Sequence, residues 1–163
     1  MKRDPVQPGQ ESVWDYPRPP RLESTARRVA IAFDGETIVD TTRALRVLET
    51  SHPPVYYVLE NEVVPGRLVR VARGSFCEWK GRAHYFDLVG ANGKRASAAA
   101  WGYAEPTTPF EALAAHVAFY AAPMDACFVD GERVTPQPGG FYGGWVTKDL
   151  AGPFKGVPGS MGW

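Results

Sequence analysis

The chain has 163 residues, of which 44% are apolar and 22% are charged, proportions typical of one globular domain. Eighteen basic residues balance eighteen acidic ones, so the basic excess with which duplex-DNA binders neutralise phosphates is missing, and we expect no nucleic-acid partner. Seventeen glycines and fifteen prolines exclude a helical bundle, because each of these residues interrupts regular helix.

Residues 1–25 are predicted to form an extended N-terminal arm. Trp14 and Tyr16 lie within it, and since free linkers rarely carry such rings, we expect the arm to dock on the body. Its prolines fix their own φ angle and restrict the residue before each of them. These prolines are Pro5, Pro8, Pro17, Pro19 and Pro20.

Residues 26–135 are predicted to form the body of a mainly β domain, which begins and ends in a tight hairpin. The β-prone runs Val29–Phe33 and Thr37–Val39 flank an Asp34-Gly35 turn, a favoured pair for a two-residue hairpin loop. Near the other end, Cys127–Val129 and Arg133–Thr135 flank a second Asp-Gly pair, so that FDGETIVD and VDGERVTP resemble each other weakly.

The middle of the body is predicted to add further strands and two short helices. A hairpin is expected at Asn92-Gly93. The first helix is expected over Thr42–Leu48, and the second over Pro109–His116, where Thr108 and Glu111 can form a capping box. The strands are expected at Pro54–Leu59, Leu68–Arg73, Ala83–Val89 and Ala96–Trp101.

Residues 136–163 are predicted to form a C-terminal arm rich in glycine and aromatic residues. A disordered tail would be poor in aromatic side chains, so we expect this arm to wrap the body with its rings pressed on the surface.

Seven stretches spread over most of the chain carry a likeness to a known family. They are ESVWDYPRPP, FDGETIVDTTRALRVLETSHPPVYYV, FCEWKGRAHYF, AAWGY, VAFY, VDGERV and PQPGGFYGGW. Together and in this order they resemble domain-of-unknown-function family 427, an uncharacterised bacterial group. The resemblance implies a fold similar to the β-tent proteins, in which two antiparallel sheets meet at an angle, with short helices beside them. It implies no established activity, although some labels for the family say nucleotidyltransferase.

Cofactors and metals are not expected. Many β-tent domains are held by a zinc ion on four cysteines, which needs two closely spaced cysteine pairs. This chain has only two isolated cysteines, Cys77 and Cys127, so we predict no metal site. A nucleotidyltransferase would also need clustered carboxylates for magnesium, and no D-x-D pair occurs.

Cys77 is the candidate for chemistry. It lies in FCEWKGRAHYF, where Lys80 could stabilise negative charge and His84 could act as a base, as in a nucleophilic or redox enzyme. The alternative is that Cys77 is a small buried apolar residue, as free cysteines usually are.

The aromatic residues indicate a ring-lined pocket, which we expect between the two sheets near the FCEWKG loop. Its predicted ligand-binding residues are Trp79, Tyr85, Trp101, Tyr142 and Trp145, with Tyr103 a further ring and Arg43 and Lys80 as polar partners. The same rings could instead serve only as core.

Three functions therefore remain open. The leading hypothesis is a small-molecule-binding domain, and the alternatives are an enzyme that uses Cys77 and a protein-interaction module. No apolar run is long enough to cross a bilayer, and the basic start is not followed by the apolar stretch of a secretory signal. We therefore expect no membrane partner and a cytoplasmic location in a bacterium.

Overall fold

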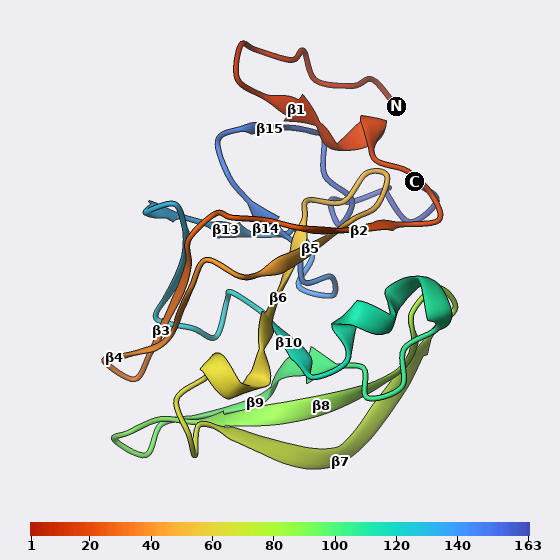
Figure 1. Cartoon of the computed structure of the whole chain (residues 1–163). Coiled ribbons are helices and arrows are strands. Elements are labelled where there is room, and N and C mark those ends of the chain that lie inside the picture. The colour runs from red at the N-terminus through yellow and green to blue at the C-terminus, as the bar shows by residue number, and fades with distance from the viewer.

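The computed structural model describes residues 1–163 and is built mainly of β-strands (Figure 1). The strands form a seven-stranded sheet, a four-stranded sheet and two small two-stranded sheets. All pairs in the two larger sheets are antiparallel, and the helical segments are three short 3₁₀ turns. The predicted mainly β, antiparallel class is confirmed.

The seven-stranded sheet has the order β2-β5-β6-β10-β9-β8-β7. The Asn92-Gly93 hairpin joins its strands β8 and β9, as predicted. Its longest strands, β7 and β8, form a hairpin at one edge and carry alternating side chains to opposite faces. In chain order the strands are β2 (Arg21–Ser24), β5 (Leu45–Leu48), β6 (Val55–Leu59), β7 (Leu68–Cys77), β8 (Gly81–Val89), β9 (Arg95–Gly102) and β10 (His116–Phe119).

The four-stranded sheet consists of the two Asp-Gly hairpins side by side. Its order is β12-β11-β3-β4, so the inner strands β3 and β11 of the two hairpins pair with each other. Asp34, Gly35, Asp130 and Gly131 all have positive φ, as the predicted tight turns require. Each turn also contacts the other hairpin, since Asp130 accepts a hydrogen bond from Arg28 and Asp125 accepts one from Gly35. The strands are β3 (Val29–Phe33), β4 (Glu36–Thr41), β11 (Ala126–Val129) and β12 (Glu132–Arg133).

The two predicted helices differ from the structure. The helix expected over Thr42–Leu48 is wrong, because Leu45–Leu48 is strand β5. Successive residues of a strand point to opposite sides, and β5 is buried on both of them. Val47 lies in one apolar cluster and Leu48 in another. The second expected helix is a 3₁₀ segment, η3 (Thr108–Leu113), interrupted at Phe110 by a non-helical φ of −117°.

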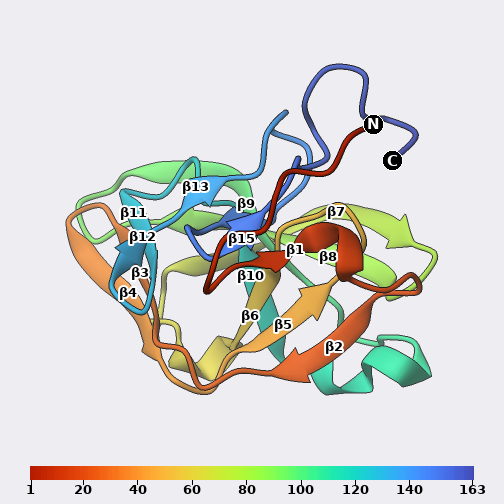
Figure 2. The ribbon, with the colours of Figure 1, turned by 90° about the horizontal axis from the view of Figure 1, so that it is seen from above.

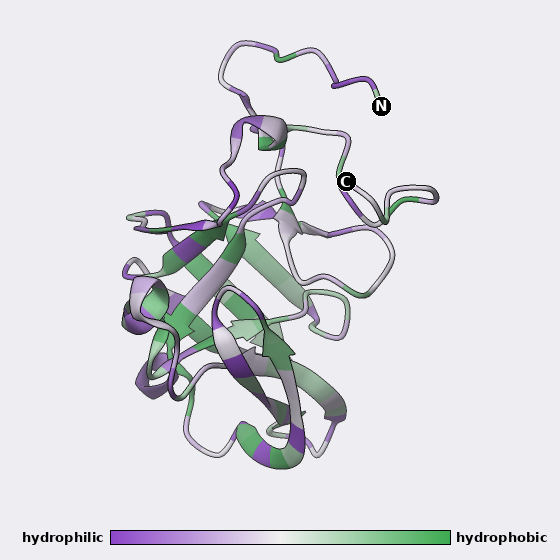
Figure 3. Ribbon diagram, turned by 90° about the vertical axis from the view of Figure 1, so that its right-hand side faces the viewer, coloured by the Kyte–Doolittle hydropathy of each residue, from purple (hydrophilic) through white to green (hydrophobic).

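Two apolar clusters lie on the two faces of the seven-stranded sheet. The larger cluster joins this sheet to the four-stranded sheet through residues such as Ile31, Phe33, Val58 and Phe119. The second cluster contains residues of β5, β6, β8, β9 and β10 with Phe110 and Leu113 of η3, and none from the four-stranded sheet. Figure 3 shows the hydrophobic residues concentrated on the strands.

The two arms pack against the body and pair with each other. Strand β1 (Glu11–Ser12) of the N-terminal arm lies parallel to β15 (Leu150–Ala151) of the C-terminal arm, as Figure 2 shows from above. Trp14, next to β1 in η1 (Val13–Asp15), donates to the Pro153 carbonyl at 2.9 Å. The remaining elements are η2 (Glu60–Glu62), β13 (Thr135–Pro136) and β14 (Trp145–Val146), of which β13 and β14 pair.

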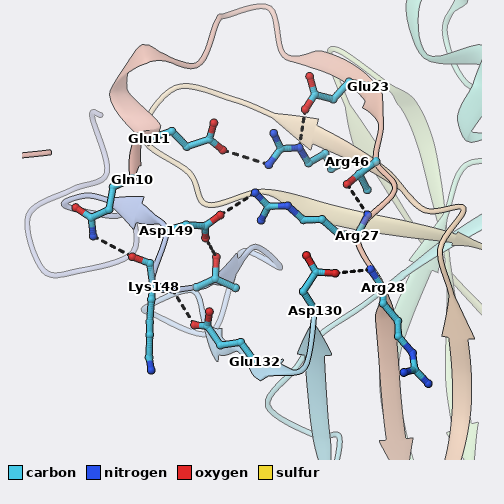
Figure 4. A network of polar contacts seen from close by, with 12 residues as sticks. Gln10, Glu11, Glu23, Arg27, Arg28, Arg46, Asp130, Glu132, Lys148 and Asp149 are labelled. Carbon is cyan, nitrogen blue, oxygen red and sulfur yellow. Dashed lines mark hydrogen bonds and ion pairs between the residues drawn. The ribbon is translucent and has the colours of Figure 1, made fainter. Parts of the chain in front are cut away.

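A polar network holds both arms to the sheets (Figure 4). Arg46 of β5 bonds Glu11 of the N-terminal arm at 3.2 Å and Glu23 of β2 at 2.6 Å. Arg27, just before β3, pairs with Asp149 of the C-terminal arm at 2.8 Å. Burial lowers the pKa of the Arg46 guanidinium, but the hydrogen bond to Glu23 and the two nearby carboxylates raise it more, so Arg46 stays charged.

Candidate functional site

A cleft of about 770 Å³ opens on the face of the seven-stranded sheet that carries the second apolar cluster. One wall is the far end of the β7–β8 hairpin, and the C-terminal arm forms the opposite wall. The floor comes from β6, β9 and Tyr120, which directly follows β10. No residue of the four-stranded sheet lines the cleft. The expected position of the pocket between the two sheets is therefore wrong. The cleft lies on the outer face of the seven-stranded sheet, beside the FCEWKG loop.

Strand alternation decides which side chains of the β7–β8 hairpin reach the cleft. Cys77 pairs with Gly81 at the end of the hairpin, and Tyr85 follows four residues later on the same face. Arg82 and His84 alternate with these positions and lie on the other face. The Oγ of Ser75 lies 2.8 Å from the Tyr85 hydroxyl and fixes that ring in the wall.

The floor of the cleft is a group of packed aromatic rings. The rings of Tyr57 and Trp101 meet edge to face with centroids 6.4 Å apart, and Trp101 also contacts Tyr120 at 4.6 Å. Tyr103 lies 6.5 Å from Tyr57. Such edge-to-face and tilted arrangements are favoured between aromatic rings, so the rings of the floor support one another.

The C-terminal arm crosses the floor at Gly143 and brings Tyr142 to the cleft. Tyr142 meets the ring of His52 edge to face at 4.9 Å. His52 is 8% exposed, and its Nδ1 lies 2.9 Å from the Thr50 carbonyl. Burial lowers the pKa of His52, although the carboxylate of Glu49 raises it, so the ring is neutral near pH 7.

Three cations line the cleft, and each lies over an aromatic ring. Arg73 lies 5.1 Å from the centroid of Tyr85. Lys80 lies 5.7 Å from that of Tyr103, and Lys155 lies 5.4 Å from that of Tyr142. None of the three cations has a carboxylate partner within 4 Å, which leaves their charge available to a ligand.

The cleft brings together most of the residues that the sequence singled out. Seven of them line it: Cys77, Trp79, Lys80, Tyr85, Trp101, Tyr103 and Tyr142. Trp79 and Lys80 belong to the turn between β7 and β8, and Thr107 donates to the Trp79 carbonyl at 2.5 Å, which ties this turn to the segment before η3.

Three predicted site residues lie outside the cleft. His84 packs on Phe86 at 5.3 Å, on the face opposite Tyr85, because neighbouring strand residues point to opposite sides. Arg43 pairs with Glu62 at 3.0 Å.

Trp145 is the third residue outside the cleft. It is 1% exposed in the larger core cluster, where it stacks on Tyr56 and donates to the Phe119 carbonyl at 3.0 Å. Its side chain therefore belongs to the core between the sheets.

Sequence reasoning missed several lining residues. Tyr57 lies in the predicted strand Pro54–Leu59, and nothing local indicates which face of a central strand meets a cleft. The sequence predicts no element at Tyr120, which follows β10. Arg73 ends the predicted strand Leu68–Arg73, but the sequence does not show which ring its side chain covers, and Lys155 reaches the cleft from the distant C-terminal arm.

The cysteines differ in their surroundings. Cys127 is 2% exposed between the sheets, and burial raises its pKa to about 12, which leaves it an inert apolar side chain. Cys77 is partly exposed in the cleft, and neither a histidine nor a carboxylate bonds it. No three His, Cys, Asp or Glu side chains lie close enough together to hold a metal ion.

Similarity to one protein family extends over most of the chain. No helix of the chain is long and apolar enough to cross a membrane. No curated protein matches the chain. The sequence model of the family described as Domain of unknown function (DUF427) matches residues 21–130, which run from β2 to the turn after β11. This match spans more than half of the chain and includes the aromatic floor and the β7–β8 wall, and the chain therefore belongs to the DUF427 family.

Proposed function

We propose that this protein binds a small molecule in the aromatic cleft on the outer face of the seven-stranded sheet. The observation that carries the proposal is that packed rings of one apolar cluster form the floor of a concavity of ligand size. Clefts that bind small molecules span roughly 300–1,000 Å³ and are lined mainly by apolar and aromatic side chains with a few polar groups. The volume of about 770 Å³ falls in that range.

The rings favour a ligand with a flat, unsaturated body. Trp101 and Tyr57 are 8% and 1% exposed, so most of their surface is already packed and only part of each ring faces the cleft. A flat ligand can cover such rings without moving them, since it stacks on a face or meets an edge.

An enzyme that uses Cys77 is supported less well. A cysteine nucleophile needs a base within hydrogen-bond reach, about 2.6–3.2 Å, and the base predicted from the sequence, His84, lies on the opposite face of β8. Protein interaction has one observation in its favour. Phe76 and Phe141, at the edge of the cleft, are 73% and 75% exposed.

A fragment screen tests the proposal. Planar aromatic fragments of neutral, cationic and anionic character are offered to the full chain, and binding is read by ligand-observed NMR. We expect hits that compete with one another and that weaken at least about fivefold in Trp79→Ala. The control Val69→Ala removes an exposed apolar side chain outside the cleft and should bind as the natural protein does.

The same screen can contradict the proposal. If no fragment of any charge binds, or if the hits bind Trp79→Ala unchanged, the cleft is not a small-molecule site. Circular dichroism of each variant checks that the variant is folded, so that a loss of binding can be told from a loss of fold.

A further inference from the structure

At one end of the cleft lie the phenol groups of two largely buried tyrosines. Tyr57 and Tyr103 are 1% and 5% exposed and both line the cleft. Two further tyrosines of the cleft have partners, since Tyr85 bonds Ser75 and Tyr120 donates to the Phe141 carbonyl. No carbonyl or carboxylate oxygen of the chain accepts a hydrogen bond from Tyr57 or Tyr103. Neither hydroxyl oxygen is fully enclosed by the chain, so each can donate to an acceptor that enters the cleft.

Both phenols remain donors at neutral pH. Burial raises the pKa of Tyr57 well above its usual range. Burial and the neighbouring Tyr57 raise the pKa of Tyr103 as well, although Lys80 lowers it. Each side chain therefore keeps its O–H and presents a hydrogen rather than a negative oxygen.

Lys80 adds one positive charge at the same end. Its ammonium lies 5.7 Å from the Tyr103 centroid and has no carboxylate within 4 Å. The side chain is partly buried in the turn between β7 and β8, so water screens its charge less than that of a fully exposed lysine.

The other end of the cleft suits an anion less well. Lys155 already donates to the Trp163 carbonyl at 3.3 Å. Glu49 brings a negative charge beside His52, which is neutral. Arg73 is exposed at the mouth, where solvent weakens its attraction.

We propose that the ligand is an aromatic carboxylate, whose oxygens accept from Tyr57 and Tyr103 and pair with Lys80 while its ring covers Trp101. This inference rests on the proposed function and names the class of ligand for that site. A phosphate ester is less suitable, because a dianion usually takes several cations or backbone N–H groups, and Lys80 is the single cation at this end with Glu78 two residues away.

Three matched probes test which class of ligand the cleft prefers, separately from whether it binds a small molecule at all. The probes are 2-naphthoate, 2-naphthamide and 2-naphthyl phosphate, which share one ring system, and binding to the full chain is measured by calorimetry at low salt. We expect 2-naphthoate to bind about tenfold more tightly than 2-naphthamide, as charge-assisted hydrogen bonds would give, and more tightly than the phosphate.

Two variants locate the carboxylate. Lys80→Gln and Tyr103→Phe should each weaken 2-naphthoate by about fivefold or more and leave 2-naphthamide within about twofold. The matched control Lys155→Gln removes a charge at the other end and should keep the preference for the acid. Tyr103→Phe keeps the ring, so it changes one hydroxyl and not the packing.

The outcomes are distinct. Equal binding of acid and amide, tighter binding of the phosphate, or an unchanged preference in Lys80→Gln would overturn the carboxylate while leaving a small-molecule cleft in place. Absence of binding by all three probes, together with no hit in the fragment screen, would overturn the cleft itself and this inference with it.

Discussion

Gly143 lies against the indole of Trp101 so closely that a Cβ at position 143 would come within 2.0 Å of its Cη2 atom. The C-terminal arm thus passes directly over a ring of the floor, and a residue with a side chain cannot take this path unless the arm or the indole moves. The absence of a side chain at position 143 therefore allows the C-terminal arm to lie directly on Trp101 and form this wall of the cleft.

Gly143→Ala should shift the arm or Trp101 and weaken aromatic probes. Overpacking of this kind costs about 1–3 kcal/mol of unfolding free energy. Urea denaturation and 2-naphthoate titration measure the two effects. The control is Gly162→Ala, because nothing lies within 4 Å of a Cβ there and its φ is not positive. An unchanged affinity in Gly143→Ala would mean that the arm is not part of the site.

Trp145 should be essential to the stability of the body although it belongs to the C-terminal arm. Its ring is 1% exposed in the larger core, so Trp145→Ala should lower the unfolding free energy by about 3–5 kcal/mol. Deletion of Gly139–Trp163 should cost at least as much. The matched variant Phe141→Ala removes a ring that is 75% exposed and should change stability by less than about 0.5 kcal/mol. A truncated chain with an unchanged melting temperature would contradict the packing of this arm.

The two cysteines should differ in their reaction with iodoacetamide. Cys127 is buried and its pKa is raised to about 12, so it should stay unmodified in the folded protein and react only on unfolding. Cys77 is partly exposed, so any label on the folded chain should be found there, although Phe76 and Trp79 next to it lead us to expect slow alkylation. Peptide mass spectrometry after timed labelling locates the modified residue.

Cys77→Ser is expected to keep the binding of aromatic probes, because the proposed contacts use rings, hydroxyls and Lys80. Rapid, stoichiometric labelling of Cys77 at pH 7 with a matching loss of binding would instead favour the enzyme hypothesis.

The stability of the protein should fall as the pH drops below 6.5. Burial lowers the pKa of His52 from 6.5 in the folded state, although Glu49 raises it. Just below pH 6.5, His52 of the unfolded chain binds a proton that the folded chain does not yet bind, so protonation favours unfolding. The full contribution of His52 to stability is therefore present only above that pH.

Urea denaturation at several pH values measures this slope, and His52→Asn should reduce it. His84→Asn should remove a contribution of the same sign, because burial, and after it the positive charge of Arg70, also lowers the pKa of His84. A natural protein whose stability does not change between pH 7.5 and the onset of carboxylate titration, near pH 4, would contradict the prediction.

Much of the sheet structure could be predicted because its signals are local. The Asp34-Gly35 and Asp130-Gly131 turns are visible in the sequence, since few residue pairs tolerate positive φ at both positions. A possible N-terminal cap predicts a helix over Thr42–Leu48. The two neighbouring strands that make Leu45–Leu48 a strand instead are not visible in the local sequence.

The candidate site could be predicted in part for the same reason. Trp79 and Tyr85 lie in one hairpin, so their proximity follows from the sequence of that hairpin. The sequence predicts Trp145 in the pocket, because an aromatic residue among glycines gives no indication of which cluster it enters. Its place is set by contacts with Tyr56 and Phe119, from strands far away in the chain.

The cleft is assembled from two parts of the chain that can vary separately. The floor and the β7–β8 wall lie within residues 21–130, which define the family, whereas the wall from Pro136 to Gly144 follows them and joins no strand of the seven-stranded sheet. A relative with the same sheet and a different arm would keep the aromatic floor under another cover. Change in this short, glycine-rich segment could therefore alter which molecules enter, and how fast they leave, at little cost to the architecture beneath.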